Sequence, residues 1–85
     1  MPADVKELTA RAVNEAFDTW ARQHPSLAAV INRIELSEQA AVSLRDSDAY
    51  RKAVAGYYRS LSEVELLNKL LSLAGPVIER LLSIH

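Results

Sequence analysis

Apolar residues recur at steps of three and four along the first part of the chain. They form one stripe on a helix and are Val5, Leu8, Ala12, Val13, Ala16, Phe17 and Trp20. This spacing predicts an amphipathic helix from Ala3 to Gln23. Pro2 suits a helix entry, and Asp4 places negative charge near the positive end of the helix dipole. His24-Pro25 ends the helix, because the residue before a proline is pushed out of the α region.

The segment after Pro25 changes its hydrophobic phase. The apolar residues near its start share one helical face and are Leu27, Val30, Ile31 and Ile34. A later set falls roughly on the opposite side of the helical wheel and comprises Leu36, Ala40 and Leu44. Two interpretations follow. Either the chain breaks or kinks near Glu35–Ser37 and Ser37 caps a new helix over residues 38–46, or one helix is buried on two faces. We favour the break over the single helix, and both over a short extended piece at this point.

A turn with polar cap residues, Arg45 to Asp48, precedes the next helical pattern. We expect Ser47 to be the N-cap of a helix that reaches about Arg59. Its core-facing positions are Ala49, Tyr50, Ala53, Val54 and Tyr57. Two nested capping-box patterns follow, Ser60-x-x-Glu63 and Ser62-x-x-Glu65, and either one supplies the start of a last helix.

The last segment is the most apolar, and its apolar residues come in doubled steps. They are Leu66, Leu67, Leu70, Leu71, Leu73, Ala74, Val77, Ile78, Leu81, Leu82 and Ile84. Gly75-Pro76 interrupts the pattern without changing its phase, because the step from Leu66 to Val77 is about 1,100°, about 20° past three full turns. We therefore predict one long helix kinked at Pro76. Its apolar side is wider than the roughly 100° that a single core face needs.

These patterns predict an all-α fold, a small bundle of four to five helices in a single domain over residues 1–85. The wide apolar side of the long C-terminal helix has two interpretations. Either this helix is surrounded by the others in a monomer, or part of its apolar side meets a second chain. We favour a homodimer, because so short a chain buries a limited core and gains from further burial. The expected interface residues are Leu66, Leu67, Leu70, Leu73, Val77, Leu81 and Ile84.

Charge is nearly balanced over the whole chain, with one basic segment. Ten Lys and Arg stand against eleven Asp and Glu, for a formal net charge of −1, which excludes a general polycation. Residues 45–59 carry more basic than acidic side chains. The candidate nucleic-acid contacts lie on the polar side of the helix expected there and are Arg51, Lys52, Tyr58 and Arg59. An ordinary solvated helix face explains the same residues, so nucleic acid is the alternative partner.

Catalytic and metal-binding chemistry has little support in the sequence. The chain has no cysteine, which excludes disulfides, thiolate zinc sites and cysteine nucleophiles. Neither His24 nor His85 has a second ligand at a metal-binding spacing, and no phosphate-binding or nucleophile motif occurs. No segment has the length and apolar character of a signal peptide or a membrane span, so we expect a cytoplasmic protein with no membrane partner.

The sequence therefore predicts a protein that is not an enzyme and needs no cofactor or metal. The favoured hypothesis is a non-catalytic protein-interaction module, a small helical homo-oligomer that presents helix surfaces to a protein partner whose identity the sequence does not give. The alternative hypothesis is a nucleic-acid-binding module that uses the basic face of the helix over residues 47–59.

Overall fold

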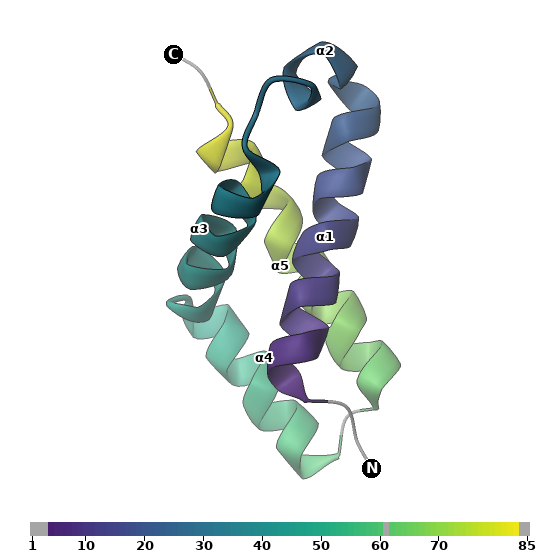
Figure 1. Cartoon of the computed structure of the whole chain (residues 1–85). Coiled ribbons are helices and arrows are strands. Elements are labelled where there is room, and N and C mark those ends of the chain that lie inside the picture. Colours follow the sequence, from purple (N-terminus) through teal and green to yellow (C-terminus); the bar gives the residue numbers. More distant parts are fainter. Residues whose placement is uncertain (1–3, 61, 84–85) are drawn as a thin grey trace.

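The computed structural model describes residues 4–60 and 62–83, which form five helices and no strand (Figure 1). The helices are α1 (Val5–Gln23), α2 (Pro25–Ala28), α3 (Arg33–Arg45), α4 (Asp48–Arg59) and α5 (Glu63–Leu81). The predicted all-α bundle of four to five helices is confirmed. The molecule is elongated, with extents of 41 × 23 × 18 Å. In Figure 1, α3 and α4 follow one another down one side, and α5 passes behind α1 on its way back.

Each of the four long helices begins at a side-chain cap. The cap oxygens accept a hydrogen bond from a backbone N–H of the first turn and belong to Asp4, Asn32, Ser47 and Ser62. Such caps satisfy donors that the helix itself leaves without a partner. The predicted cap Ser47 is confirmed. Of the two predicted capping boxes, the one from Ser62 to Glu65 starts α5, whereas Ser60 is the C-cap of α4.

The break after Pro25 lies earlier than the sequence analysis predicts. α2 ends at Ala28 and α3 begins at Arg33, so Glu35–Ser37 lies inside a continuous helix. The predicted helix over residues 38–46 with Ser37 as its cap is therefore wrong. The physical reason is Asn32, whose Oδ1 accepts a hydrogen bond from the Glu35 backbone N–H at 3.2 Å and starts the helix before the expected break.

α5 is the central helix of the bundle, since it contacts α1, α3 and α4. Three helices around it explain why its apolar side is so wide. The largest fully buried side chains come from α1, α3 and α5 and are Phe17, Leu8, Leu44, Leu66, Leu70 and Ile78. α5 continues through Gly75-Pro76, which confirms one helix in place of two, and the kink at Pro76 stays a prediction.

A buried polar contact ties α1 to α4. The Thr9 side chain is 2% exposed, and its hydroxyl donates a hydrogen bond to the Val5 carbonyl at 2.7 Å. The Tyr50 hydroxyl lies 3.0 Å from the same Thr9 oxygen. Because the single hydroxyl proton of Thr9 is directed to Val5, Tyr50 is the donor in this pair. Both hydroxyl groups are thereby satisfied inside the bundle.

The two residues of this pair are not equivalent, and their substitutions should differ. Tyr50→Phe leaves Thr9 bonded to Val5, so it should lower the free energy of unfolding by only about 1 kcal/mol. Thr9→Val leaves the buried Tyr50 hydroxyl without a partner and should cost more, about 1–3 kcal/mol. Urea denaturation of both variants measures the difference. Equal stability of the wild type and T9V would contradict this account of the pair.

Gly75 lies inside α5 where the structure leaves room for a side chain. Apart from its chain neighbours and the nearby backbone of α5, no heavy atom lies within 4 Å of the position that a Cβ would take, and Gly75 has no positive φ. Alanine loses about 0.5–1 kcal/mol less backbone entropy on folding than glycine, but a Cβ directly before Pro76 is disfavoured in a helix, so Gly75→Ala should change the free energy of unfolding by less than about 0.5 kcal/mol. Thermal and urea unfolding measure this. A more strongly destabilised G75A would instead show that α5 needs glycine beside Pro76 to bend.

Candidate functional site

The structure distributes the expected interface residues of α5 between the core and the edge of the bundle. Leu66 and Leu70 are 0% exposed and Val77 is 7% exposed, so these three belong to the core of the single chain. Leu67, Leu73 and Leu81 are half-buried and pack against that core. Ile84 lies outside the described residues. Self-association stays a prediction, but most of the stripe on α5 is already covered by α1, α3 and α4.

α3 is a single helix with two apolar faces. The inner face packs into the bundle through Leu36, Ala40 and Leu44. The outer face carries Ile34 and Val42, whose exposed fractions are 77% and 53%. The phase change in the sequence therefore falls at the break between α2 and α3, so the single helix of the disfavoured interpretation is not observed, and of the first apolar set only Ile34 lies on the outer face of α3. That second face is exposed in the single chain, whereas the interpretation expected it to be buried.

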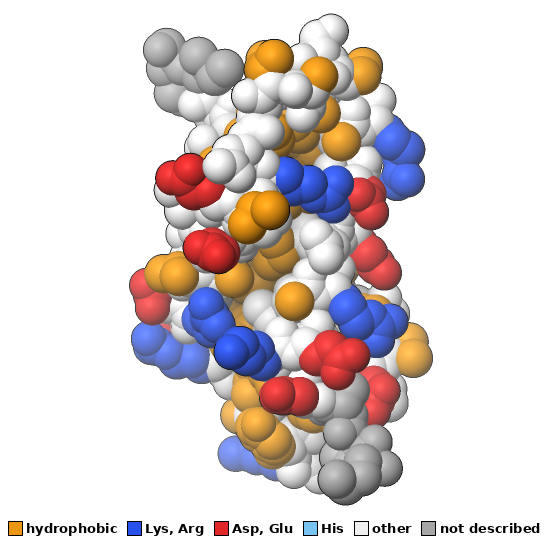
Figure 2. All heavy atoms as spheres, in the orientation of Figure 1, with side chains coloured by type: hydrophobic (Ala, Val, Ile, Leu, Met, Phe, Trp, Pro, Cys, Tyr) orange, Lys and Arg blue, Asp and Glu red, His pale blue; other side chains and the backbone are white. Residues whose placement is uncertain are grey.

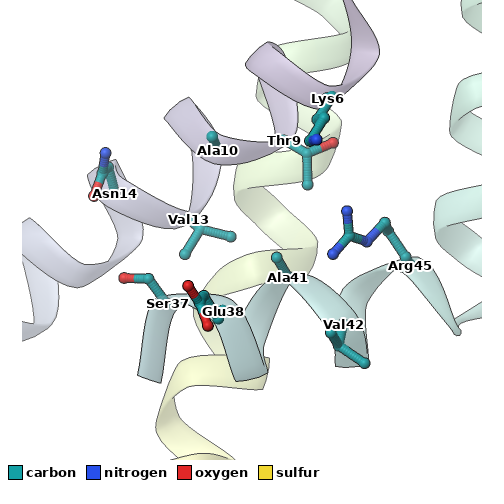
Figure 3. A pocket seen from close by; sticks show the side chains of 10 residues that line it. All are labelled: Lys6, Thr9, Ala10, Val13, Asn14, Ser37, Glu38, Ala41, Val42 and Arg45. Atoms are coloured by element: carbon teal, nitrogen blue, oxygen red, sulfur yellow. The ribbon is translucent and has the colours of Figure 1, made fainter. Parts of the chain in front are cut away.

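A groove runs between α1 and α3, and Figure 2 shows apolar side chains at the bottom of this hollow with charged side chains along its edges. Its volume is about 420 Å³. Figure 3 shows the residues that line it, which are Lys6, Thr9, Ala10, Val13 and Asn14 of α1 and Ser37, Glu38, Ala41, Val42 and Arg45 of α3. We call this hollow the α1–α3 groove.

A second hollow lies on the other side of α3, toward the end of α5. Glu38 and Val42 line this hollow as well as the α1–α3 groove, and Leu81 of α5 contributes to it. The outer side of α3 is thus raised between two hollows. We call its residues Ile34, Glu38, Val42 and Arg45 the α3 ridge. A raised helix beside an apolar groove is the surface shape by which helices pack against one another.

Arg33 holds the start of α3 against α1. Its guanidinium donates a hydrogen bond to the Asn14 carbonyl at 2.9 Å and forms an ion pair with Asp18 at 2.8 Å. The same group lies 5.5 Å from the centre of the Phe17 ring, within the range of a cation–π contact. These contacts fix the separation of the two helices at one end of the groove.

Charges of opposite sign lie at different positions along the groove and ridge. Lys6 and Arg45 lie at one end, and Glu38 lies about two helical turns before Arg45 on the same face of α3 (Figure 3). Within the described part of the chain, the ion pairs join Arg33 to Asp18 and Arg51 to Asp48. The charges of the groove therefore have no ionic partner among the described residues.

The connection from α2 to α3 exposes further apolar side chains. Leu27 is 39% exposed and Val30 is 80% exposed, whereas Ile31 packs against the core. The sequence pattern places these residues with Ile34 on one helical face. The structure instead divides them between α2, the connection and the start of α3, and it leaves most of them at the surface.

The four candidate nucleic-acid contacts are all exposed on α4, away from buried Tyr50 and Ala53. Arg51 is paired with Asp48 at 3.3 Å, which reduces the positive charge of the patch. Tyr58 is 75% exposed, and its ring centre lies 5.9 Å from that of Tyr57. Loss of solvation, and next the nearby Glu63 carboxylate, raise the pKa of the Tyr57 hydroxyl above its ordinary value.

Metal-binding and membrane-spanning features are absent from the described residues. The described residues contain no group of three or more His, Asp or Glu side chains arranged to hold a metal ion. His24 stacks on Trp20 with ring centres 5.0 Å apart, at the junction of α1 and α2. None of the helices in the described ranges combines the length and apolar character that crossing a membrane requires.

The alternative hypothesis, that α4 binds nucleic acid, can be tested directly. With acidic Asp48 beside Arg51 and a net charge of −1, we expect no measurable binding of a labelled DNA or RNA duplex at 150 mM salt. Fluorescence anisotropy at 50 and 150 mM salt measures this. Binding that weakens steeply with salt and is lost in the combined variant R51E/K52E/R59E would support the nucleic-acid function instead.

Comparisons with known proteins were made on the whole chain. No family model, no curated protein and no solved structure matches it.

Proposed function

We propose that this protein is a non-catalytic protein-interaction module that forms a small homo-oligomer through the α3 ridge and the α1–α3 groove. One observation carries the proposal, the second apolar face of α3. Ile34 and Val42 are exposed on a helix whose other face is already packed into the core. Exposed apolar side chains beside a groove are typical of a surface that another helix covers.

The size of the exposed surface supports the same proposal. The chain exposes 5714 Å². A compact monomer of 9.4 kDa is expected to expose about 5,000 Å². The difference of roughly 700 Å² reflects the elongated shape of the molecule, whose extents are 41 × 23 × 18 Å. An elongated molecule with this excess gains from packing against a second copy.

The proposal assigns different roles to different surfaces. The α3 ridge joins copies of the chain, and the assembled copies present their remaining helix surfaces to another protein. Leu27 and Val30 are candidates for that second role, because both are exposed and lie outside the α1–α3 groove. The expected cytoplasmic location is part of this proposal and is testable by fractionating cells that express the chain.

Two matched substitutions test whether the ridge is an interface. Val42→Glu places a charge on the α3 ridge, and Val64→Glu makes the same change at a valine of α5 that is 67% exposed. Light scattering coupled to size exclusion should give twice the chain mass for the wild type and V64E, and the chain mass for V42E. Burial of a charge without a partner is the physical reason. Circular dichroism checks that both variants remain folded.

A wild-type chain that remains monomeric up to 100 µM would overturn the proposal. A folded V42E variant that still associates as the wild type does would place the interface elsewhere, with half-buried Leu67, Leu73 and Leu81 of α5 as the next residues to substitute.

A further inference from the structure

The α3 ridge specifies how two copies are oriented. We infer that the homo-oligomer is a dimer in which α3 packs antiparallel to α3 of a second copy, with the helices crossing at Ala41 and Val42. This inference rests on the proposed function and adds to it the identity of the partner surface and its register. The α3 ridge of each copy would then pack against α3 of the other copy, at the edge of its α1–α3 groove.

The central residues suit a close crossing of two helices. Ala41 is small and half-buried at the side of the groove, so it allows the second helix to approach. Val42 lies next to it on the ridge and supplies an apolar side chain to insert. In a two-fold arrangement, Ala41 of each copy faces Val42 of the other, so the same small-and-large contact is made twice.

The charges along α3 favour the antiparallel direction. With Ala41 opposite Val42 of the second copy, Glu38 lies opposite Arg45 of that copy, and the symmetry gives this pair twice. Lys6 lies in the groove at the same end as Arg45 and adds a second positive charge there (Figure 3). A parallel arrangement would instead bring Glu38 near Glu38 and Arg45 near Arg45, which is repulsive. Charge complementarity therefore selects a second copy in the antiparallel orientation.

Charge reversal tests the register, with the dimer dissociation constant measured by sedimentation equilibrium at 50 mM salt. E38R and R45E should each weaken the dimer about tenfold, because each one replaces two attractive pairs by two repulsive ones. The combined variant E38R/R45E should return to within about threefold of the wild type, since the exchange restores opposite charges. In 1 M salt the differences should shrink, because the pairs are exposed to screening.

Mixing the single variants gives the sharpest result. In an equimolar mixture of E38R and R45E, the arginine introduced in one chain faces the glutamate introduced in the other, and the native Arg45 and Glu38 face each other as well. The heterodimer should therefore form about as tightly as the wild-type dimer, whereas in a parallel arrangement it would form much more tightly than the wild-type dimer, whose like charges would repel. Lys52 lies on α4 outside the groove, so K52E alone should leave the dimer unchanged. K52E has the same net charge as R45E, so E38R mixed with K52E should gain no such rescue.

The outcomes separate this inference from the proposed function. A dimer that V42E disrupts but that shows no response to E38R or R45E would overturn the antiparallel register and leave the proposed function standing. Tighter pairing of E38R with the wild type than of the wild type with itself would indicate the parallel arrangement and also overturn the register, because it would remove a repulsion between two Glu38 side chains. A wild-type chain that is monomeric throughout would overturn both.

Discussion

The packing of α5 against three other helices is the contact on which the rest of the structure depends. Leu66 and Leu70 are fully buried in it, and α1, α3 and α4 each cover part of the same helix. A helix in this position needs apolar residues around most of its circumference. The stripe on α5 is therefore explained by the fold of one chain, and an interface is more readily formed by a helix that packs on α5 with one face and leaves its other face exposed.

α3 carries more apolar residues than its packing against α1 and α5 can bury. Its inner face reaches α5 and α1 through Ala40 and Leu44, and its outer face cannot reach the core at the same time. Val42 and Ile34 therefore remain in water in the single chain. The Arg33 contacts with Asp18 and Phe17 keep α3 beside α1, so the apolar residues are presented along a groove. Packing, the groove and the charge order of Glu38 and Arg45 are the three properties that support a dimer.

The sequence was sufficient to predict helices whose ends or buried faces are set by residues close together in the chain. Ser47 caps α4, the phase across Gly75-Pro76 makes α5 one helix, and the α1 stripe from Leu8 to Trp20 is the face that is buried. It was insufficient where two local causes compete, as Asn32 and Ser37 do for the start of α3. It was also insufficient for the interface, because a helical wheel gives the width of an apolar side but not which elements cover it. The phase change was visible in the sequence, but only the structure showed that it marks a break between α2 and α3 and that Ile34 and Val42 remain exposed on α3.

The central claim is that the outer face of α3 is covered by a second copy, and the Val42 methyl groups report on this directly. Methyl NMR with a water-soluble paramagnetic agent measures how accessible they are as the protein concentration rises, with the methyl groups of Val64 as an internal reference. The account predicts that the Val42 signals become protected at concentrations where association occurs, while the Val64 signals stay accessible. Equal accessibility of both valines at every concentration would contradict it.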